Sequence, residues 1–167
     1  GAPAIGHESH LVMKAVVQRV QSASVTHGTR TESIGKGLLV LLGVGRGDGL
    51  EEANWMVHRI AHLRVFPDEA QKMRHAVVDH GSDVLVISQF PLLADPSSGH
   101  RPSFIPAAPA EVAEPLYEHV VSRLQQTEGI GSVKKGMFGE YMQVALVNDG
   151  PVTIMLERAP SPPRQQC

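Results

Sequence analysis

A run of five apolar residues, Leu38-Leu39-Val40-Leu41-Leu42, constrains the fold of this chain more than any other feature. An apolar run without alternation is typical of a strand that is buried on both faces in the middle of a sheet. The turn signal Gly35-Lys36-Gly37 comes directly before the run. We therefore expect this segment to form the central strand of a sheet.

Several other segments have the composition of strands. Residues 14–26 alternate between two sets of side chains and contain many β-branched residues, and His27-Gly28-Thr29 is typical of a turn. The remaining expected strands are residues 64–66, 84–87, 141–147 and 152–156. The last two are joined by Asn148-Asp149-Gly150-Pro151, whose residue types dominate turns. The alternative is a Gly-Pro unit that presents carbonyl acceptors, because proline has no N–H.

Two helices are expected where apolar residues recur at helical spacing. Asp48, with Glu51 three residues later, resembles a capping box at the start of the first helix. Its expected buried face consists of Ala53, Met56, Val57, Ile60 and Ala61. Pro109 suits the first turn of the second helix, and Pro115 predicts that this helix starts later or bends. The apolar face of the second helix comprises Ala113, Leu116, Tyr117, Val120, Val121 and Leu124.

A length of 167 residues is typical of one domain. Residues 1–12 precede the first strand-like segment, and we interpret them as added sequence or a native extension. The folded domain is expected to span residues 13–157, and residues 158–167 to form an extended, mobile tail. The order of strands and two main helices predicts a single-domain, mixed α/β (α+β) layered fold without regular βαβ winding.

Charge and cysteine content exclude several classes of protein. With 15 Lys and Arg against 17 Asp and Glu, the chain lacks the broad basic surface of proteins that coat long nucleic acids, and no DNA partner is expected. Contact with a few nucleotides remains open. The single cysteine, Cys167, permits no intrachain disulfide and no cysteine-based zinc site. No run approaches the ~18 apolar residues of a membrane span, so we expect a cytoplasmic protein.

Three local patterns have a chemical interpretation and a commoner structural one. The glycines between Gly43 and Gly49 match no phosphate-binding spacing, which favours an ordinary connection. His58 and His62 lie four apart on the expected first helix, but no third ligand completes a metal site. Ser88 follows a buried strand without the glycines of a nucleophile elbow, which favours a hydrogen-bonding role at the strand end.

Taken together, several segments resemble one family, the D-aminoacyl-tRNA deacylases. The resemblance spans Met13 to about Glu157 and depends on the order and spacing of short motifs. These are residues 13–20 and 35–44, Ser88-Gln89-Phe90-Pro91-Leu92, Arg101-Pro102-Ser103-Phe104, Phe138-Gly139-Glu140-Tyr141-Met142 and Asn148-Asp149-Gly150-Pro151-Val152-Thr153. The last motif is similar to a Gly-cisPro signature, which favours a functional role over a simple turn.

The resemblance implies a homodimer that hydrolyses the ester between a D-amino acid and the 3′ end of tRNA. In such proteins the Gly-cisPro pair of one subunit enters the pocket of the other, and here that role would fall to Gly150 and Pro151. Their carbonyls would face the substrate amino group and the space that an L side chain would fill, so the wrong enantiomer is rejected. Glycine has no side chain to reject, so glycyl-tRNA is an expected second substrate.

The resemblance also implies catalysis without a metal or cofactor, in which the terminal ribose 2′-OH helps to activate water. The backbone N–H of Phe90 is the expected oxyanion contact, with Ser88 and Gln89 shaping the same wall. Thr153 would orient substrate or water, and a nucleophilic Thr153 is the second choice because no base is visible. Phe90 and Met142 would hold the terminal adenine by apolar contact.

Contacts to the rest of the tRNA are expected from a small basic set, which consists of His100, Arg101, Lys134 and Lys135. Family members commonly carry lysine in the loop where this chain has Ser97-Ser98-Gly99-His100, which bears on tRNA affinity more than on chemistry. Arg19 is expected to brace the Gly-Pro loop.

Two other functions remain open from the sequence. A non-catalytic protein that binds the tRNA 3′ end on the same scaffold is favoured by the altered loop. A general small-ester hydrolase would need an activated protein nucleophile, and the sequence offers none.

Overall fold

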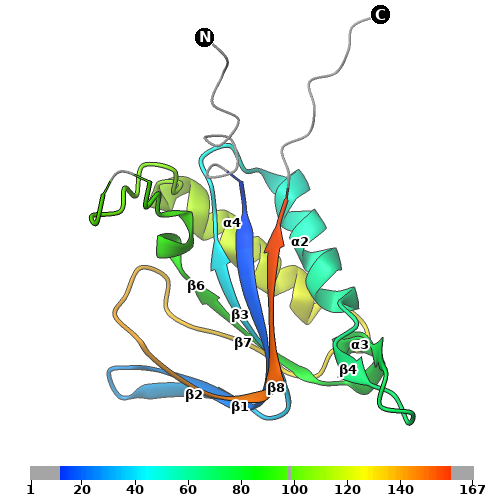
Figure 1. Ribbon diagram of the computed structural model, residues 1–167. Coiled ribbons are helices and arrows are strands. Elements are labelled where there is room, and N and C mark those ends of the chain that lie inside the picture. Colours follow the sequence, from blue (N-terminus) through cyan, green and yellow to red (C-terminus); the bar gives the residue numbers. More distant parts are fainter. Residues whose placement is uncertain (1–11, 98, 159–167) are drawn as a thin grey trace, which may run out of the picture.

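The computed structural model of this chain describes residues 12–97 and 99–158. A six-stranded sheet, with two long helices packed on one of its faces, forms most of the molecule, and a small two-stranded sheet lies at one end (Figure 1). The expected mixed α/β fold is confirmed. The expectations for residues 1–11 and for the tail that ends at Cys167 concern parts of the chain outside the described ranges. Val12 and Met13, by contrast, are buried.

The main sheet has the strand order β2-β1-β3-β6-β7. β8 stands outside this order and pairs with β1 as well. Its strands are β1 (Lys14–His27), β2 (Arg30–Ile34), β3 (Gly37–Gly43), β6 (Asp83–Ser88), β7 (Val133–Lys135) and β8 (Gln143–Glu157). β3 runs antiparallel to β1 and parallel to β6, and β6 runs parallel to β7. The apolar run therefore lies in the middle of the sheet, as its composition predicts.

The side chains of β3 contribute to two cores, because successive residues of a strand point to opposite faces. Leu38, Val40 and Leu42 belong to the large core between the sheet and the helices. Leu39 belongs to a smaller core on the other face, which also contains Val20, Val25, Ile34, Leu85 and Ile87. Burial on both faces explains why the run has no polar residue.

The two long helices are α2 (Leu50–His62) and α4 (Ala110–Gln125), and their expected apolar faces are buried. The capping box predicted for Asp48 and Glu51 is wrong. Gly49 is the N-cap of α2, and the Glu52 carboxylate accepts its N–H at 2.8 Å. Asp48 instead accepts the N–H of Gly45 at 2.6 Å, which closes the turn before the helix. In α4 the helix begins directly after Pro109 and includes Pro115, so it does not start later.

The segment between α2 and β6 is less regular than the sequence predicts. The strand expected at residues 64–66 is wrong, since only β4 (Phe66–Pro67) pairs there, with β5 (Met73–His75). The Asp68 carboxylate accepts the N–H groups of Ala70 and Lys72 at 2.8 and 2.9 Å, and this shapes the connection between the two strands. A short helix, α3 (Val77–His80), leads into β6.

Candidate active site

An irregularity in the pairing of β8 with β1 contains the Asn-Asp-Gly-Pro segment. Thr153 lies opposite Gln18 and Asn148 lies opposite Val20, so five residue steps of β8 span two steps of β1. The surplus residues form a bulge in one continuous strand. The hairpin turn predicted from composition is therefore wrong, because the residues before and after the bulge belong to β8 and pair with the same neighbour.

Gly150 and Pro151 lie in this bulge, and both are exposed. The peptide bond between them is cis. Gly150 has a φ of +134°, which side-chain-bearing residues rarely adopt. A Cβ at this position would lie 2.8 Å from Nη2 of Arg19 and 2.9 Å from Cγ2 of Val152. Backbone conformation and close packing therefore both require glycine here.

Two side chains hold the bulge in place. Nε of Arg19 donates to the carbonyl oxygen of Asp149 at 3.1 Å and lies 3.3 Å from its carboxylate. Nη1 of Arg19 donates to the carbonyl oxygen of Val65 at 2.5 Å. The amide of Asn148 donates to the carbonyl oxygens of Arg19 and Val152, at 2.9 and 3.1 Å. The first and last parts of the bulge are thus tied to β1 and to the segment before β4.

Thr153 follows the bulge and is exposed. The amide of Gln18 donates to Oγ1 of Thr153 at 3.2 Å. An amide N–H cannot accept the hydroxyl proton, so this contact orients the hydroxyl group without activating it as a nucleophile.

A second group of expected site residues lies where β6 ends. Ser88 is the last residue of β6 and lies opposite Leu42 of β3. The N–H of Gln89 donates to the carbonyl oxygen of Leu42 at 2.7 Å, and the 3-10 helix η2 (Phe90–Leu93) follows. η2 packs so closely on Gly43 that a side chain there would collide with Leu93.

Phe90 is the first residue of η2, where a backbone N–H has no acceptor within the helix. Its ring is exposed and stands edge-on to the ring of Phe104, with centroids 5.2 Å apart. Met142 is half-buried and packs against the smaller core, and its sulfur accepts the N–H of Met137 at 3.3 Å. Two exposed aromatic rings and a fixed thioether provide apolar surfaces of the kind that nucleobases contact.

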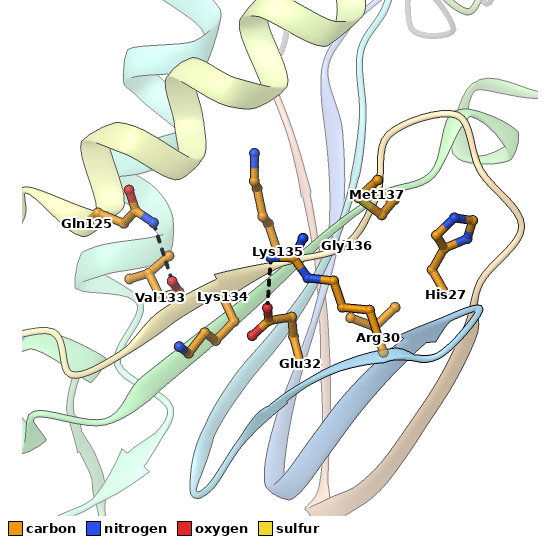
Figure 2. Close-up of a pocket in the computed structure, with 10 residues that line it drawn as sticks. His27, Arg30, Glu32, Gln125, Val133, Lys134, Lys135, Gly136 and Met137 are labelled. Atoms are coloured by element: carbon orange, nitrogen blue, oxygen red, sulfur yellow. Dashed lines mark hydrogen bonds and ion pairs between the residues drawn. The ribbon is translucent and has the colours of Figure 1, made fainter.

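The expected phosphate contacts lie in two places. His100 and Arg101 are exposed in the loop between η2 and α4, where Asp95 and Ser103 pair through both backbone groups. Lys134 and Lys135 are on β7 and line a cavity of about 430 Å³, shown in Figure 2. Nζ of Lys135 also binds both carboxylate oxygens of Glu118, each at 2.7 Å.

The structure brings together Arg19, Gly150, Pro151 and Thr153, and separately Ser88, Gln89 and Phe90. Sequence reasoning missed Asn148 and Gln18 as supports of the first group. The only available signal was that Asn148 opens the Gly-Pro motif and that Gln18 adjoins Arg19. Within residues 12–97 and 99–158, no three His, Cys, Asp or Glu side chains gather as metal ligands, and no helix could span a membrane.

Comparison with known proteins places the chain in a family. The family model described as D-Tyr-tRNA(Tyr) deacylase matches residues 16–157. A protein of Thermomicrobium roseum named D-aminoacyl-tRNA deacylase is 51% identical over 148 residues, which cover 88% of this chain and 95% of the relative. A protein of Chlorobium limicola with the same name is 53% identical over 146 residues, which cover 87% of this chain and 97% of the relative.

Two solved structures share the fold. One is named c-Myc DNA Unwinding Element Binding Protein; it is 44% identical, with a TM-score of 0.82, over 89% of this chain and 99% of its own. The other is described as a probable eukaryotic D-amino acid tRNA deacylase; it is 14% identical, with a TM-score of 0.77, over 88% of this chain and all of its own. The chain belongs to the D-Tyr-tRNA(Tyr) deacylase family, as its motifs predict.

Proposed function

We propose that this protein hydrolyses the ester bond of D-aminoacyl-tRNA in the cytoplasm and releases the D-amino acid and free tRNA. Family membership supports the reaction class. The observation that carries the proposal is the exposed Gly150-Pro151 bulge, which is held by Arg19 and Asn148 and whose sequence resembles the family's Gly-Pro motif. A rigid, exposed backbone segment is suited to recognising the configuration of a small group, because it cannot move aside for the wrong one.

Chiral selection would come from the backbone of the bulge. The carbonyl oxygens of Gly150 and Pro151 accept hydrogen bonds from the amino group of the substrate. They also occupy the side on which an L side chain would lie, so an L ester meets both a steric clash and the desolvation of a carbonyl group. A glycyl ester has no side chain on either face, and we propose glycyl-tRNA as a second substrate.

The proposal requires a second copy of the chain. Thr153, Gln18, Leu39 and Leu85 lie side by side on β8, β1, β3 and β6. Three strand spacings of about 4.8 Å place the bulge roughly 14 Å from the strand that ends at Ser88. One ester cannot contact both groups of one chain at that separation. In a homodimer the Gly150-Pro151 bulge of one subunit enters the pocket at Phe90 of the other.

The exposed surface of β8 supports a dimer. Its apolar side chains are well exposed, at Val144, Leu146, Val147 and Met155. Apolar side chains in contact with water favour association, because their burial removes apolar surface from solvent.

In the proposed reaction, water attacks the carbonyl carbon of the ester. The ribose 2′-OH of the terminal adenosine helps to activate the water, and the bond to the 3′ oxygen breaks as that oxygen gains a proton. The N–H of Phe90 binds the developing oxyanion, and Ser88 and Gln89 shape this wall of the pocket. Thr153 orients the substrate or the water, and Phe90 and Met142 contact the adenine.

Incubation of the protein with D-tyrosyl-tRNA tests the proposal against its rivals. Release of tyrosine well above the rate in buffer is expected, whereas a non-catalytic binder of the tRNA end would bind this RNA without releasing the amino acid. A general ester hydrolase is distinguished by D-tyrosyl-tRNA that ends in 2′-deoxyadenosine. The proposal predicts little cleavage of that substrate, whereas an enzyme with its own nucleophile would still cleave it.

A further inference from the structure

The cavity in Figure 2 is a cleft with two walls from distant parts of the chain. One wall comes from the C-terminal end of β1 and from β2, and contains His27, Arg30 and Glu32. The other wall comes from β7 and the C-terminal end of α4. Figure 2 shows Arg30 and Glu32 extending from β2 toward β7, which carries Lys134 and Lys135. The cleft has a volume of about 430 Å³.

Positive charge predominates among the lining residues, although the whole chain has a formal charge of −2. The cleft is lined by three cationic side chains, Arg30, Lys134 and Lys135, and by His27. Among the lining residues that the structure describes, Glu32 has the only carboxylate. Arg30 lies 3.3 Å from Glu32, and Lys135 is bound to Glu118 of α4. Within residues 12–97 and 99–158, the ammonium group of Lys134 belongs to none of the ion pairs found.

The cleft is connected to Met142 by hydrogen bonds. Met137 lines the cleft, and its N–H donates to the sulfur of Met142 at 3.3 Å. Nδ1 of His27 pairs with the carbonyl oxygen of Tyr141 at 3.0 Å. Both walls are therefore bound to the loop that carries Met142, where the proposed function places the terminal adenine. The cleft therefore adjoins the position that the proposed function gives to the terminal adenine.

We propose that the cleft binds backbone phosphates of the single-stranded 3′ end of tRNA, with Arg30 and Lys134 as the main contacts. The inference rests on the proposed function, from which it takes the position of the adenine. Proteins that bind single strands combine a positively charged groove for the backbone with apolar surfaces for the bases. The lining residues, all of which the structure describes, include no Phe, Tyr or Trp on which a base could stack, whereas Arg30 and Lys134 supply the positive charge that suits a phosphate group.

Replacement of Arg30 by Ala tests this assignment, with Arg74→Ala as the matched control. Both arginines are exposed and both pair with one carboxylate, at 3.3 Å for Arg30 with Glu32 and 3.4 Å for Arg74 with Asp68. Arg74 lies on β5, in the small sheet away from the cleft. Kinetics are measured on D-tyrosyl-tRNA and on 3′-O-D-tyrosyl-adenosine, which has no phosphate, at several salt concentrations.

Arg30→Ala is expected to raise KM for D-tyrosyl-tRNA by roughly fivefold. The negative slope of log(kcat/KM) against log[salt] should become shallower by about one, because one phosphate contact is lost. The adenosine ester is affected at least threefold less. Lys134→Ala gives the same pattern, and Glu32→Gln lowers KM for the tRNA because it removes a repelling charge. Equal effects on both substrates, or a result for Arg30→Ala and Lys134→Ala that matches Arg74→Ala, would overturn the assignment.

Binding of an RNA hairpin that has a single-stranded 3′ CCA end and no attached amino acid separates this inference from the proposed function. Arg30→Ala and Lys134→Ala are expected to weaken this binding at least threefold relative to the wild type and to Arg74→Ala, whether or not the protein cleaves esters. Unchanged binding in both variants contradicts the cleft as a phosphate site. Absence of cleavage by the wild type, with this binding pattern intact, contradicts the proposed function alone.

Discussion

Nε of Arg19 on β1 donates a hydrogen bond of 3.1 Å to the carbonyl oxygen of Asp149 on β8, 130 residues further along the chain. The same guanidinium donates to Val65, before β4. The side chain of Arg19 is only 11% exposed, so both bonds are shielded from competing water. Together with Asn148, this partly buried cation and its two backbone acceptors fix the position of the Gly150-Pro151 bulge.

Replacement of Arg19 by Ala is expected to lower the free energy of unfolding by about 2 kcal/mol, because two shielded carbonyl groups lose their donor. Arg19→Lys keeps the charge but lacks the planar fork that reaches both acceptors, and should recover less than half of this loss. Urea denaturation measures both. Arg74→Ala, which removes an ion pair whose arginine is 63% exposed, should cost less than about 0.5 kcal/mol. An Arg19→Ala variant as stable as Arg74→Ala would contradict the bracing role.

Gly150→Ala is expected to displace the bulge, because the new Cβ would lie 2.8 Å from Nη2 of Arg19. The ratio of D-tyrosyl-tRNA to L-tyrosyl-tRNA cleavage should fall at least tenfold. The control is Gly28→Ala, which also has a positive φ but no neighbouring atom within 4 Å of the added Cβ. The control should lose stability without a change in the ratio. If Gly150→Ala kept the wild-type ratio, the bulge would have no part in chiral selection.

Thr153→Val tests whether this residue is a nucleophile. The hydroxyl is bonded to the amide of Gln18, which cannot act as a base, so the variant should keep a measurable kcat, lowered by about tenfold or less. Single-turnover assays on D-tyrosyl-tRNA measure this, with circular dichroism as a control for folding. Loss of all activity above the buffer rate in a folded protein would instead support a covalent role for Thr153.

Asp48 should make stability depend on pH. Burial raises the pKa of this carboxyl to about 6, against the lowering effect of the N–H groups of Gly45 and Met13. In the unfolded chain it ionises near pH 4, so between pH 4 and 6 the folded state binds more protons than the unfolded state. The free energy of unfolding therefore falls as the pH rises through this window and remains lowered above it.

Asp48→Asn removes this titration and keeps an oxygen acceptor for Gly45. The stability of the variant relative to the wild type should rise by up to about 3 kcal/mol from pH 4 to pH 6.5. Denaturation curves at both values measure the difference. A difference that does not change with pH would show that the Asp48 carboxyl titrates normally.

The parts of the fold that follow from regular periodicity were predictable. The run 38–42 predicts a central strand because both of its faces are buried, and α2 and α4 are predicted by apolar residues three and four apart. β4, β5, α3 and β7 were not, since each has four residues or fewer and depends on tertiary contacts. The box at Asp48 and Glu51 failed because the carboxylate of Asp48 closes a turn of its own.

The site was less predictable than the fold. Asn, Asp, Gly and Pro have the same preference for turns whether the chain reverses or bulges within one strand, so composition alone could not distinguish the two. The outcome is set by Arg19 and Asn148, whose partners lie on other strands or across the bulge. The family motifs in the sequence, by contrast, drew attention to Gly150 and Pro151, the residues that lie in the bulge.

The most direct test of the central claim compares the initial rates at which the protein cleaves D-tyrosyl-tRNA and L-tyrosyl-tRNA under identical conditions. The account predicts that the D ester is cleaved at least a hundredfold faster than the L ester, because the bulge at Gly150-Pro151 occupies the space of an L side chain. Equal rates for the two enantiomers, or no cleavage of either above the rate in buffer, would contradict it.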